Sequence, residues 1–248
     1  CSSDLPGDAT LVVIPLFHVT GLVMGLLCGL GGGATGIILP RWDREYALRT
    51  IPAEQVTHWI NVPTMVIDLL AAPGDAADTA MRRLRIIGGG GAAIPKPIED
   101  RLRDTYGLDY ITGYGLTESA AAATVIPVGR PKSGTVGVPF LGTDLRIIES
   151  VGGPVDAPRV LPTGEEGEIV LRGPQITAGY WHDPAATAEA TAVIDGVEFF
   201  RTGDVGFLDE QGYVTITDRL KRLINASGFK VSPAEVEQVF YGHEAVRE

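Results

Sequence analysis

The first apolar segments of the chain predict a buried strand followed by a glycine-rich helix. The run Leu11–Ile14 is apolar without alternation, as in a strand covered on both faces, and Pro15 closes it. No residue from Leu16 to Leu39 carries a full charge, and glycine recurs at every fourth position from Gly21 to Gly33. A transmembrane helix with a glycine packing stripe is one interpretation of this pattern.

A short core helix whose glycines pack closely on a neighbour explains the same pattern better. Three glycines at 31–33 would end the helix and leave Phe17 to Leu30, and about 14 residues suit a buried core helix rather than a membrane span. Gly31, Gly33 and Gly36 also match the spacing of a dinucleotide-binding fingerprint. That fingerprint needs a strand before the glycines and a helix after them. Here the order is reversed, so we reject it.

Strands and helices then alternate, which predicts a layered α/β sheet subdomain over residues 1–140. Asp43 is a typical N-cap residue, and prolines or glycines delimit the later helices. In chain order the predicted elements are a strand at Gly36–Leu39, a helix from Asp43 through Arg49, a strand at Val56–Val62, a helix at Thr64–Ala72 that Pro63 opens, a strand at Leu84–Ile87, a helix at Pro95–Tyr106 that Gly107 stops, and a strand at Leu108–Ile111.

Beyond Pro127 the pattern changes to short β-rich runs separated by turn clusters, which predicts an antiparallel, barrel-like subdomain over residues 141–217. Residues 218–248 are expected to form a hinge and the truncated start of a C-terminal domain. The runs that carry these predictions are strands at Asp144–Ile148, Glu168–Arg172 and Tyr213–Thr217, a short helix near Ala185–Ala192, and an amphipathic helix at Ala234–Tyr241 that Pro233 opens.

Composition limits the classes of function. The 248 residues are 45% hydrophobic and 21% charged, which is typical of a globular protein, and the net charge is −11 without a lysine and arginine run. This argues against a nucleic-acid surface, whereas a small anionic ligand needs only a few donors. Cys1 and Cys28 form neither a disulfide framework nor a zinc signature, so we expect a reducing, cytoplasmic location. The first residue is not Met, so the chain is expected to begin downstream of its gene's start.

Two glycine-rich segments are candidate ligand sites. Gly88 to Ala93 follow a strand and precede a helix, which places bare backbone at the carboxyl end of a sheet, where α/β proteins bind ligands. No Gly-Lys-Ser/Thr follows, so this is not a P-loop. In Gly113-Tyr114-Gly115 the flanking glycines allow a sharp turn that presents the ring, which could lie against a purine. Both segments are expected at the same edge of the sheet.

Polar residues beside these segments suit a nucleotide with its metal. Thr117 and Glu118 place a hydroxyl and a carboxylate together, and such oxygen donors suit Mg²⁺ carrying phosphates. Asp204 follows an apolar run and could accept hydrogen bonds from vicinal hydroxyls such as those of a ribose. The alternatives are structural: a tight turn with a packed tyrosine, a turn aspartate and, for the basic segment at residues 218–222, a solvated linker.

Taken together in chain order, these motifs resemble the adenylate-forming superfamily, and most of all its acyl-CoA synthetases. The resemblance runs from about Thr10 to the end and implies the fold of that superfamily. It rests on Pro15-Leu16-Phe17-His18, Gly89-Gly90-Gly91-Ala92, Gly113-Tyr114-Gly115-Leu116-Thr117-Glu118, Gly179-Tyr180-Trp181, Thr202-Gly203-Asp204, Asp218-Arg219-Leu220-Lys221, Gly228 and Pro233-Ala234-Glu235-Val236-Glu237.

The resemblance implies a two-step reaction with ATP, Mg²⁺ and coenzyme A, in which a carboxylic acid becomes an acyl-adenylate and then a thioester. The acid would be a fatty or aryl acid, and a homodimer is compatible with the resemblance. The implied roles are adenine binding by Gly90, Gly91, Ala92, Gly113, Tyr114 and Gly115, phosphate and Mg²⁺ binding by Thr117 and Glu118, ribose binding by Asp204 with Arg219, contact with the carboxylate and α-phosphate by His18, and a hinge at Lys221.

The chain also departs from the family pattern. The family's Ser/Thr/Gly-rich phosphate loop and its C-terminal lysine are absent from the sequence, so the chain resembles a middle segment. We therefore expect it not to complete the reaction by itself. A non-catalytic nucleotide-binding fragment is one alternative, and an adenylation domain acting on a carrier-protein thiol is another. Peptide-synthetase domains carry an acidic residue shortly after the first motif, whereas Val19 to Leu22 contain none, which favours an acid without an amino group.

Overall fold

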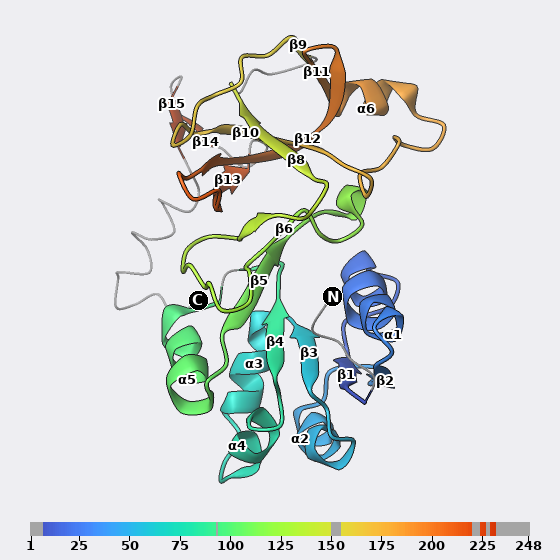
Figure 1. Cartoon of the computed structure of the whole chain (residues 1–248), viewed down its shortest axis with the longest axis vertical. Helices are drawn as coiled ribbons and strands as arrows, with labels where there is room; N and C mark the ends of the chain where they lie inside the picture. The colour runs from blue at the N-terminus through green and yellow to red at the C-terminus, as the bar shows by residue number, and fades with distance from the viewer. Residues whose placement is uncertain (1–6, 93, 150–154, 220–223, 227–228, 232–248) are drawn as a thin grey trace. The chain divides into compact units, whose positions relative to one another are not determined.

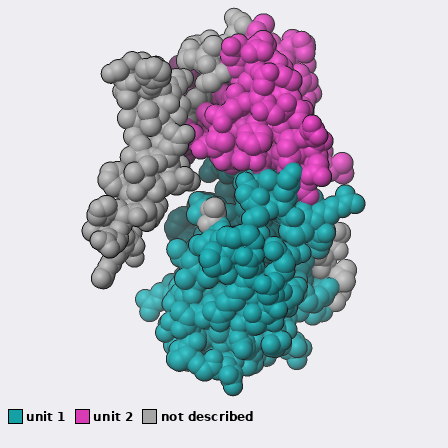
Figure 2. All heavy atoms as spheres, turned by 90° about the vertical axis from the view of Figure 1, so that its left-hand side faces the viewer, with its two compact units in different colours: residues 1–140 teal, residues 141–248 magenta. Residues whose placement is uncertain are grey.

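The computed structural model of the protein describes residues 7–92, 94–149, 155–219, 224–226 and 229–231 (Figure 1). The chain divides into two compact units, Cys1–Phe140 and Leu141–Glu248, which are called unit 1 and unit 2 and are coloured separately in Figure 2. Each unit has its own sheet and its own buried residues.

Unit 1 is built on a seven-stranded sheet in the order β2-β1-β3-β4-β5-β6-β7. The first five of these are parallel, so their carboxyl ends lie along one edge, and β6 and β7 continue the sheet antiparallel. The strands are β1 (Ala9–Val12), β2 (Thr35–Ile38), β3 (His58–Asn61), β4 (Ile86–Gly89), β5 (Tyr110–Tyr114), β6 (Thr124–Val125) and β7 (Val138–Pro139).

Helices connect the parallel strands and cover their apolar side chains. The core contains Leu11 and Trp59 from the sheet, and Ile51, Leu69 and Leu102 from three helices, all fully buried. The Asp43 carboxylate accepts a hydrogen bond from the Tyr46 N–H, which confirms the predicted N-cap. The helices are η1 (Thr20–Leu27, a π-helix), α1 (Cys28–Gly31), α2 (Arg44–Ala53), α3 (Pro63–Leu70), α4 (Ala76–Met81), α5 (Lys96–Tyr106) and the 3₁₀ turn η2 (Thr117–Ser119).

The observed strands β1 and β4 are each displaced by two residues from their predicted bounds. β1 lies two residues earlier in the chain than predicted, and β4 lies two residues later. β1 covers Ala9–Val12 because these residues pair with β2. β4 continues through Gly88 and Gly89, which sequence reasoning assigned to a loop. Backbone pairing decides this, since Gly88 lies opposite Ile60 on β3 and Ile111 on β5.

The helix expected from Phe17 to Leu30 begins later, and eight of its residues are π-helical. Its glycine face packs closely on β1, as predicted: a Cβ at Gly29 would lie 2.7 Å from Thr10 Cγ2. Full burial was a wrong prediction, because Leu27 and Leu30 on its other face are half-exposed. Among the described residues, no helix has the length and apolar character needed to cross a bilayer.

Unit 2 is a curled, mostly antiparallel sheet in the order β8-β10-β12-β11-β9, with β13 paired to β12, and it confirms the predicted barrel-like character. Phe199 and Val170 belong to its buried cluster. The elements are β8 (Asp144–Ile148), β9 (Val155–Asp156), β10 (Gly167–Arg172), α6 (Pro184–Glu189), β11 (Thr191–Ile194), β12 (Val197–Leu208) and β13 (Val214–Arg219), and a hairpin of β14 (Ile224–Ala226) and β15 (Phe229–Val231) follows. The predicted helix at Ala234–Tyr241 lies outside the described residues.

Candidate functional site

The two glycine-rich segments of unit 1 meet at the carboxyl edge of neighbouring strands. β4 and β5 run parallel with Gly89 opposite Thr112, so Gly90 and Gly113 follow directly at the same edge. A Cβ at Gly90 would lie 2.8 Å from the Gly113 carbonyl oxygen. Gly91 has a φ of +83° with nothing within 4 Å of its Cβ position. This edge therefore offers exposed backbone that a planar ligand can approach closely.

The turn after β5 is held by a buried serine. Ser119 Oγ accepts a hydrogen bond from the Leu116 N–H (2.9 Å) and donates one to the Leu116 carbonyl (3.1 Å). A Cβ at Gly115 would lie 2.2 Å from the Ala121 carbonyl oxygen, so only glycine fits this approach. The turn fixes the backbone of Thr117, whose side chain is exposed, and of Glu118, which is partly buried.

His18 lies in the exposed turn between β1 and η1, beyond the carboxyl end of a strand of the same parallel sheet. Its Nδ1 accepts a hydrogen bond from the Thr20 N–H at 3.1 Å. A neutral ring bonded in this way carries its proton on Nε2, because Nδ1 is the acceptor. Nε2 is then the atom that can donate to an oxygen of a ligand.

A buried polar pair that sequence reasoning missed lies beneath the glycine edge. The Tyr110 hydroxyl on β5 donates to Asn61 Oδ1 on β3 at 2.9 Å, and Asn61 Nδ2 donates to the Trp59 carbonyl at 3.1 Å. Gly89 on β4 lies between them, since its Cβ would be 2.8 Å from the Tyr110 oxygen. Burial raises the pKa of Tyr110 well above that of a free phenol. An amide at the end of an apolar strand was the only local signal for this pair.

We expect Tyr110→Phe to lower the free energy of unfolding by about 1 to 3 kcal/mol, because Asn61 Oδ1 then stays buried without its donor. In the same variant, the free energy of unfolding should fall less steeply than in wild type as the pH is raised above about 10. The pKa of Tyr110 is higher in the folded protein than in the unfolded chain, where it is about 10. The neutral phenol therefore stabilises the fold fully below about pH 10, and this stabilisation is lost as the pH rises from there towards the pKa of the folded state. Urea unfolding from about pH 8 to about pH 11 measures both effects. Tyr46→Phe, at an exposed ring, is the control, and equal pH slopes in Tyr110→Phe and wild type would contradict the assignment.

In unit 2, Asp204 and Arg219 form an ion pair across neighbouring strands. The two residues are opposite each other in the β12–β13 pairing, and Arg219 Nε lies 3.2 Å from Asp204 Oδ1. The Asp204 side chain is 11% exposed and that of Arg219 is 50% exposed. Asp204 was expected in a turn, but β12 continues to Leu208 because its second half pairs with β13. Lys221, the predicted hinge, lies outside the described residues.

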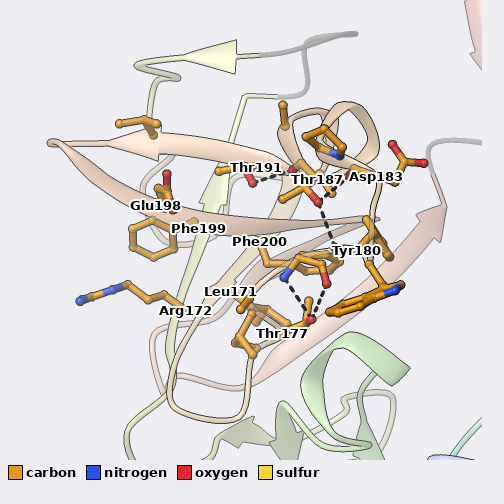
Figure 3. Close-up of a pocket in the computed structure, with 18 of the residues that line it drawn as sticks. Leu171, Arg172, Thr177, Tyr180, Asp183, Thr187, Thr191, Glu198, Phe199 and Phe200 are labelled. Atoms are coloured by element: carbon orange, nitrogen blue, oxygen red, sulfur yellow. Dashed lines mark hydrogen bonds between the residues drawn. The ribbon is translucent and has the colours of Figure 1, made fainter.

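A cavity of about 1050 Å³ opens beside β10, β12 and α6 within unit 2 (Figure 3). The predicted motif Gly179-Tyr180-Trp181 lines one side of it, with Phe200 from β12 and Arg172 from β10 among the other lining residues. Thr187 Oγ1 accepts from the Tyr180 N–H at 2.9 Å and so ties this loop to α6. The residues predicted to bind ATP are not among those that line this cavity.

The oxygen donors at residues 117 and 118 are of the kind that Mg²⁺ takes together with phosphates. Within the described ranges, no group of three or more His, Cys, Asp or Glu side chains is placed to hold a metal. Mg²⁺ commonly takes one or two carboxylates together with substrate phosphates and water. Glu118 supplies one such carboxylate and Thr117 an exposed hydroxyl.

A family model described as AMP-binding enzyme matches residues 1–181. The chain is 39% identical over 248 residues to the feruloyl-CoA synthase of Amycolatopsis sp, covering 98% of this chain and 48% of that protein. It is 34% identical over 242 residues to the long-chain-fatty-acid–CoA ligase of Bacillus subtilis (strain 168), covering 97% of this chain and 41% of that protein.

The fold of the chain is also similar to that of solved structures. O-succinylbenzoate coenzyme A synthetase from Bacillus subtilis, in complex with ATP and magnesium ion, matches with a TM-score of 0.79 at 30% identity, covering 97% of this chain and 48% of that one. The chain thus spans about half the length of the relatives that it matches.

Proposed function

Because the chain belongs to the family of AMP-binding enzymes, we propose that its protein activates a carboxylic acid with ATP and transfers the acyl group to the thiol of coenzyme A. In the first step a carboxylate oxygen bonds to the α-phosphorus of ATP. The bond between that phosphorus and the bridging oxygen of the pyrophosphate breaks, and pyrophosphate leaves. In the second step the thiol gives its proton to water, its sulfur bonds to the acyl carbon, and the bond between that carbon and the AMP oxygen breaks as AMP leaves. The observation that carries this proposal is the contact between Gly90 and Gly113 at the edge that also presents Thr117 and Glu118.

The adenine and phosphates are assigned to unit 1. Gly90, Gly91 and Ala92 supply backbone against one side of the purine, and Tyr114, the last residue of β5, supplies an aromatic face. The turn expected on both sides of that ring lies only after it: Gly113 pairs with Val125 of β6 as part of β5, whereas Gly115 lets the backbone approach the Ala121 carbonyl closely. Thr117 and Glu118 would hold Mg²⁺, and the bound ion would offset the negative charge that develops on the phosphates.

The remaining groups act on the ribose and on the carboxylate. Asp204 accepts hydrogen bonds from the vicinal ribose hydroxyls, and Arg219 holds its carboxylate in place through the 3.2 Å ion pair. His18 donates from Nε2 to the carboxylate or the α-phosphate, as its Nδ1 bond allows. The hinge at Lys221, the cytoplasmic location and a homodimer stay predictions from the sequence.

We expect the full-length protein to activate aryl and fatty acids and to reject α-amino acids. The residues after His18 are Val19, Thr20, Gly21 and Leu22, so no carboxylate there can pair with a substrate ammonium group. An unpaired ammonium in an apolar site is costly, and we expect a preference of at least about tenfold in kcat/KM. The names of the two relatives above, a feruloyl-CoA synthase and a long-chain-fatty-acid–CoA ligase, support the same class.

The experiment is pyrophosphate exchange into ATP with panels of aryl, fatty and α-amino acids, followed by a thiol-transfer assay. Exchange with an aryl or fatty acid and thioester formation on free coenzyme A are the expected results. A preference for any α-amino acid would overturn the substrate class. Transfer to a carrier-protein thiol but not to coenzyme A would overturn the assigned acceptor, and no exchange with any acid would favour a non-catalytic nucleotide-binding protein.

A further inference from the structure

A buried ion pair in unit 2 bonds the backbone one residue before the candidate ribose carboxylate, Asp204. Glu168 on β10 and Arg201 on β12 have side chains that are only 2% and 9% exposed. Arg201 Nε lies 3.2 Å from both carboxylate oxygens of Glu168, and Nη2 lies 2.6 Å from Oε2. Glu168 Oε1 also accepts a hydrogen bond from the Gly203 backbone N–H at 3.3 Å. One carboxylate thus binds both a side chain and the main chain of β12.

The bonds of Glu168 reach the segment where β12 departs from regular pairing. Glu168 lies opposite Val205 and Val170 lies opposite Arg201, so the three residues 202–204 on β12 face a single residue on β10. Gly203 takes a φ of +71°, which residues with a side chain rarely adopt. Such a bulge re-aims the side chains that it carries. Asp204 is the last of the three.

The bulge is also closed by Thr202, so its backbone groups are held on both sides of Gly203. Thr202 Oγ1 donates to the Ile169 carbonyl at 2.7 Å and accepts from the Asp204 N–H at 3.0 Å. Glu168 adds the bond at Gly203. The backbone that sets the direction of the Asp204 carboxylate is therefore fixed from β10.

We propose that Glu168 is a positioning residue for Asp204, and that it sets the ribose specificity of the nucleotide site through Arg201 and the Gly203 backbone. This rests on the proposed function, in which Asp204 binds the ribose hydroxyls. Buried ion pairs often stabilise a fold no better than apolar residues of similar volume. A role in geometry gives a reason for burying this one: without Glu168, the bulge keeps the Thr202 bonds but loses the bond at the Gly203 N–H and the link to Arg201.

The test compares ATP with 3′-deoxy-ATP in the full-length protein, because only the first offers both vicinal hydroxyls. Glu168→Gln keeps the size of the side chain and an oxygen for the Gly203 N–H, but removes the charge that Arg201 needs. Glu168→Leu combined with Arg201→Met removes the pair as a unit and so avoids an unpaired buried charge. Glu149→Gln is the control, because it breaks an ion pair of the same unit in which Arg159 and Glu149 are both more than half exposed.

We expect the ratio of kcat/KM for ATP to that for 3′-deoxy-ATP to fall roughly fivefold in both Glu168 variants, the size typical of one weakened hydrogen bond. The KM for the acid and the ratio in Glu149→Gln should stay within about twofold of wild type, since neither depends on the bulge. A general loss of structure would lower kcat with both nucleotides alike and leave the ratio unchanged.

Two results would overturn the inference, and they differ in what else they affect. If wild type prefers ATP and the folded variants keep the same ratio, Glu168 does not position Asp204, while the proposed ribose site stands. If wild type shows no preference for ATP, the ribose assignment of Asp204 is wrong and this inference fails with it. Circular dichroism establishes folding, and the double variant decides the matter where Glu168→Gln alone does not fold.

Discussion

Replacing Gly89 with alanine is expected to destabilise unit 1 strongly, although it adds only a single methyl group. The new Cβ would lie 1.9 Å from the Asn61 carbonyl oxygen and 2.8 Å from the Tyr110 hydroxyl. The first contact is with backbone of the neighbouring strand β3, which cannot rotate away as a side chain would. Either β4 separates from β3 or the buried Asn61–Tyr110 hydrogen bond breaks.

We expect a loss of about 3 kcal/mol or more, at or above the upper end of the usual cost of overpacking. For a protein of this size that corresponds to a fall in Tm of roughly 6 to 12 °C, measured by circular dichroism. Gly31→Ala is the matched control: it adds the same methyl group at the end of α1, where nothing lies within 4 Å. A Tm for Gly89→Ala within about 2 °C of wild type would contradict the close approach of β3 and β4.

The order of elements could be predicted from local signals, but the strand ends could not. Asp43 as an N-cap and the apolar runs around Trp59 and Ile87 each carry their own pattern. Glycine is a poor strand former in isolation, so Gly88 and Gly89 read as loop. They extend β4 because both neighbouring strands offer backbone partners there, and a sequence does not show those partners.

The glycine stripe in the first helix predicted one contact of that helix but not its full environment. Spacing predicted a close helix contact, and Gly29 against Thr10 confirms it. The stripe carries no signal for the π-helical turns or for the exposure of Leu27 and Leu30, because both depend on what covers the helix. The spacing of the glycines shows which face of the helix carries small residues, but it does not show what covers the face that carries large side chains.

For the candidate site, the sequence indicated residues that belong to local motifs and missed the pairs Tyr110–Asn61 and Arg201–Glu168, whose members are far apart in the chain. The glycines around Tyr114 and the Thr117–Glu118 pair form local motifs, so they can be recognised without a structure. Tyr110 bonds a residue 49 positions away and Arg201 one that is 33 positions away. A glutamate in a strand reads as a solvated residue until its partner is located, and so Glu168 gave no signal.

Asp204→Asn is expected to raise the KM for ATP by about ten- to a hundredfold. A carboxylate that accepts two hydroxyl donors makes charge-assisted bonds of roughly 1.5 to 3 kcal/mol, and the neutral amide loses that assistance. The side chain is only 11% exposed, so water does little to screen these bonds. Because asparagine has nearly the same volume, the effect reports charge rather than a cavity.

The stability of the variant should change little, which separates binding from folding. Arg219, which loses its partner, is half-exposed and stays solvated, and asparagine is neutral, so no buried charge is left unpaired and the loss is expected to be about 1 kcal/mol. Asp195→Asn is the control, because it removes an equal charge from the same unit at a carboxylate that is 86% exposed. Steady-state kinetics with ATP and with the acid varied in turn measure both KM values.

A raised KM for ATP with an unchanged KM for the acid supports the ribose assignment. The opposite split, an unchanged dependence on ATP with a weaker acid, would show that the carboxylate faces the acyl side. The preference for ATP over 3′-deoxy-ATP is an independent measurement. If Asp204 binds both ribose hydroxyls, Asp204→Asn should reduce this preference. If that preference survives in Asp204→Asn, another group reads the ribose, and Arg219, its ion-pair partner on β13, becomes the residue to replace next.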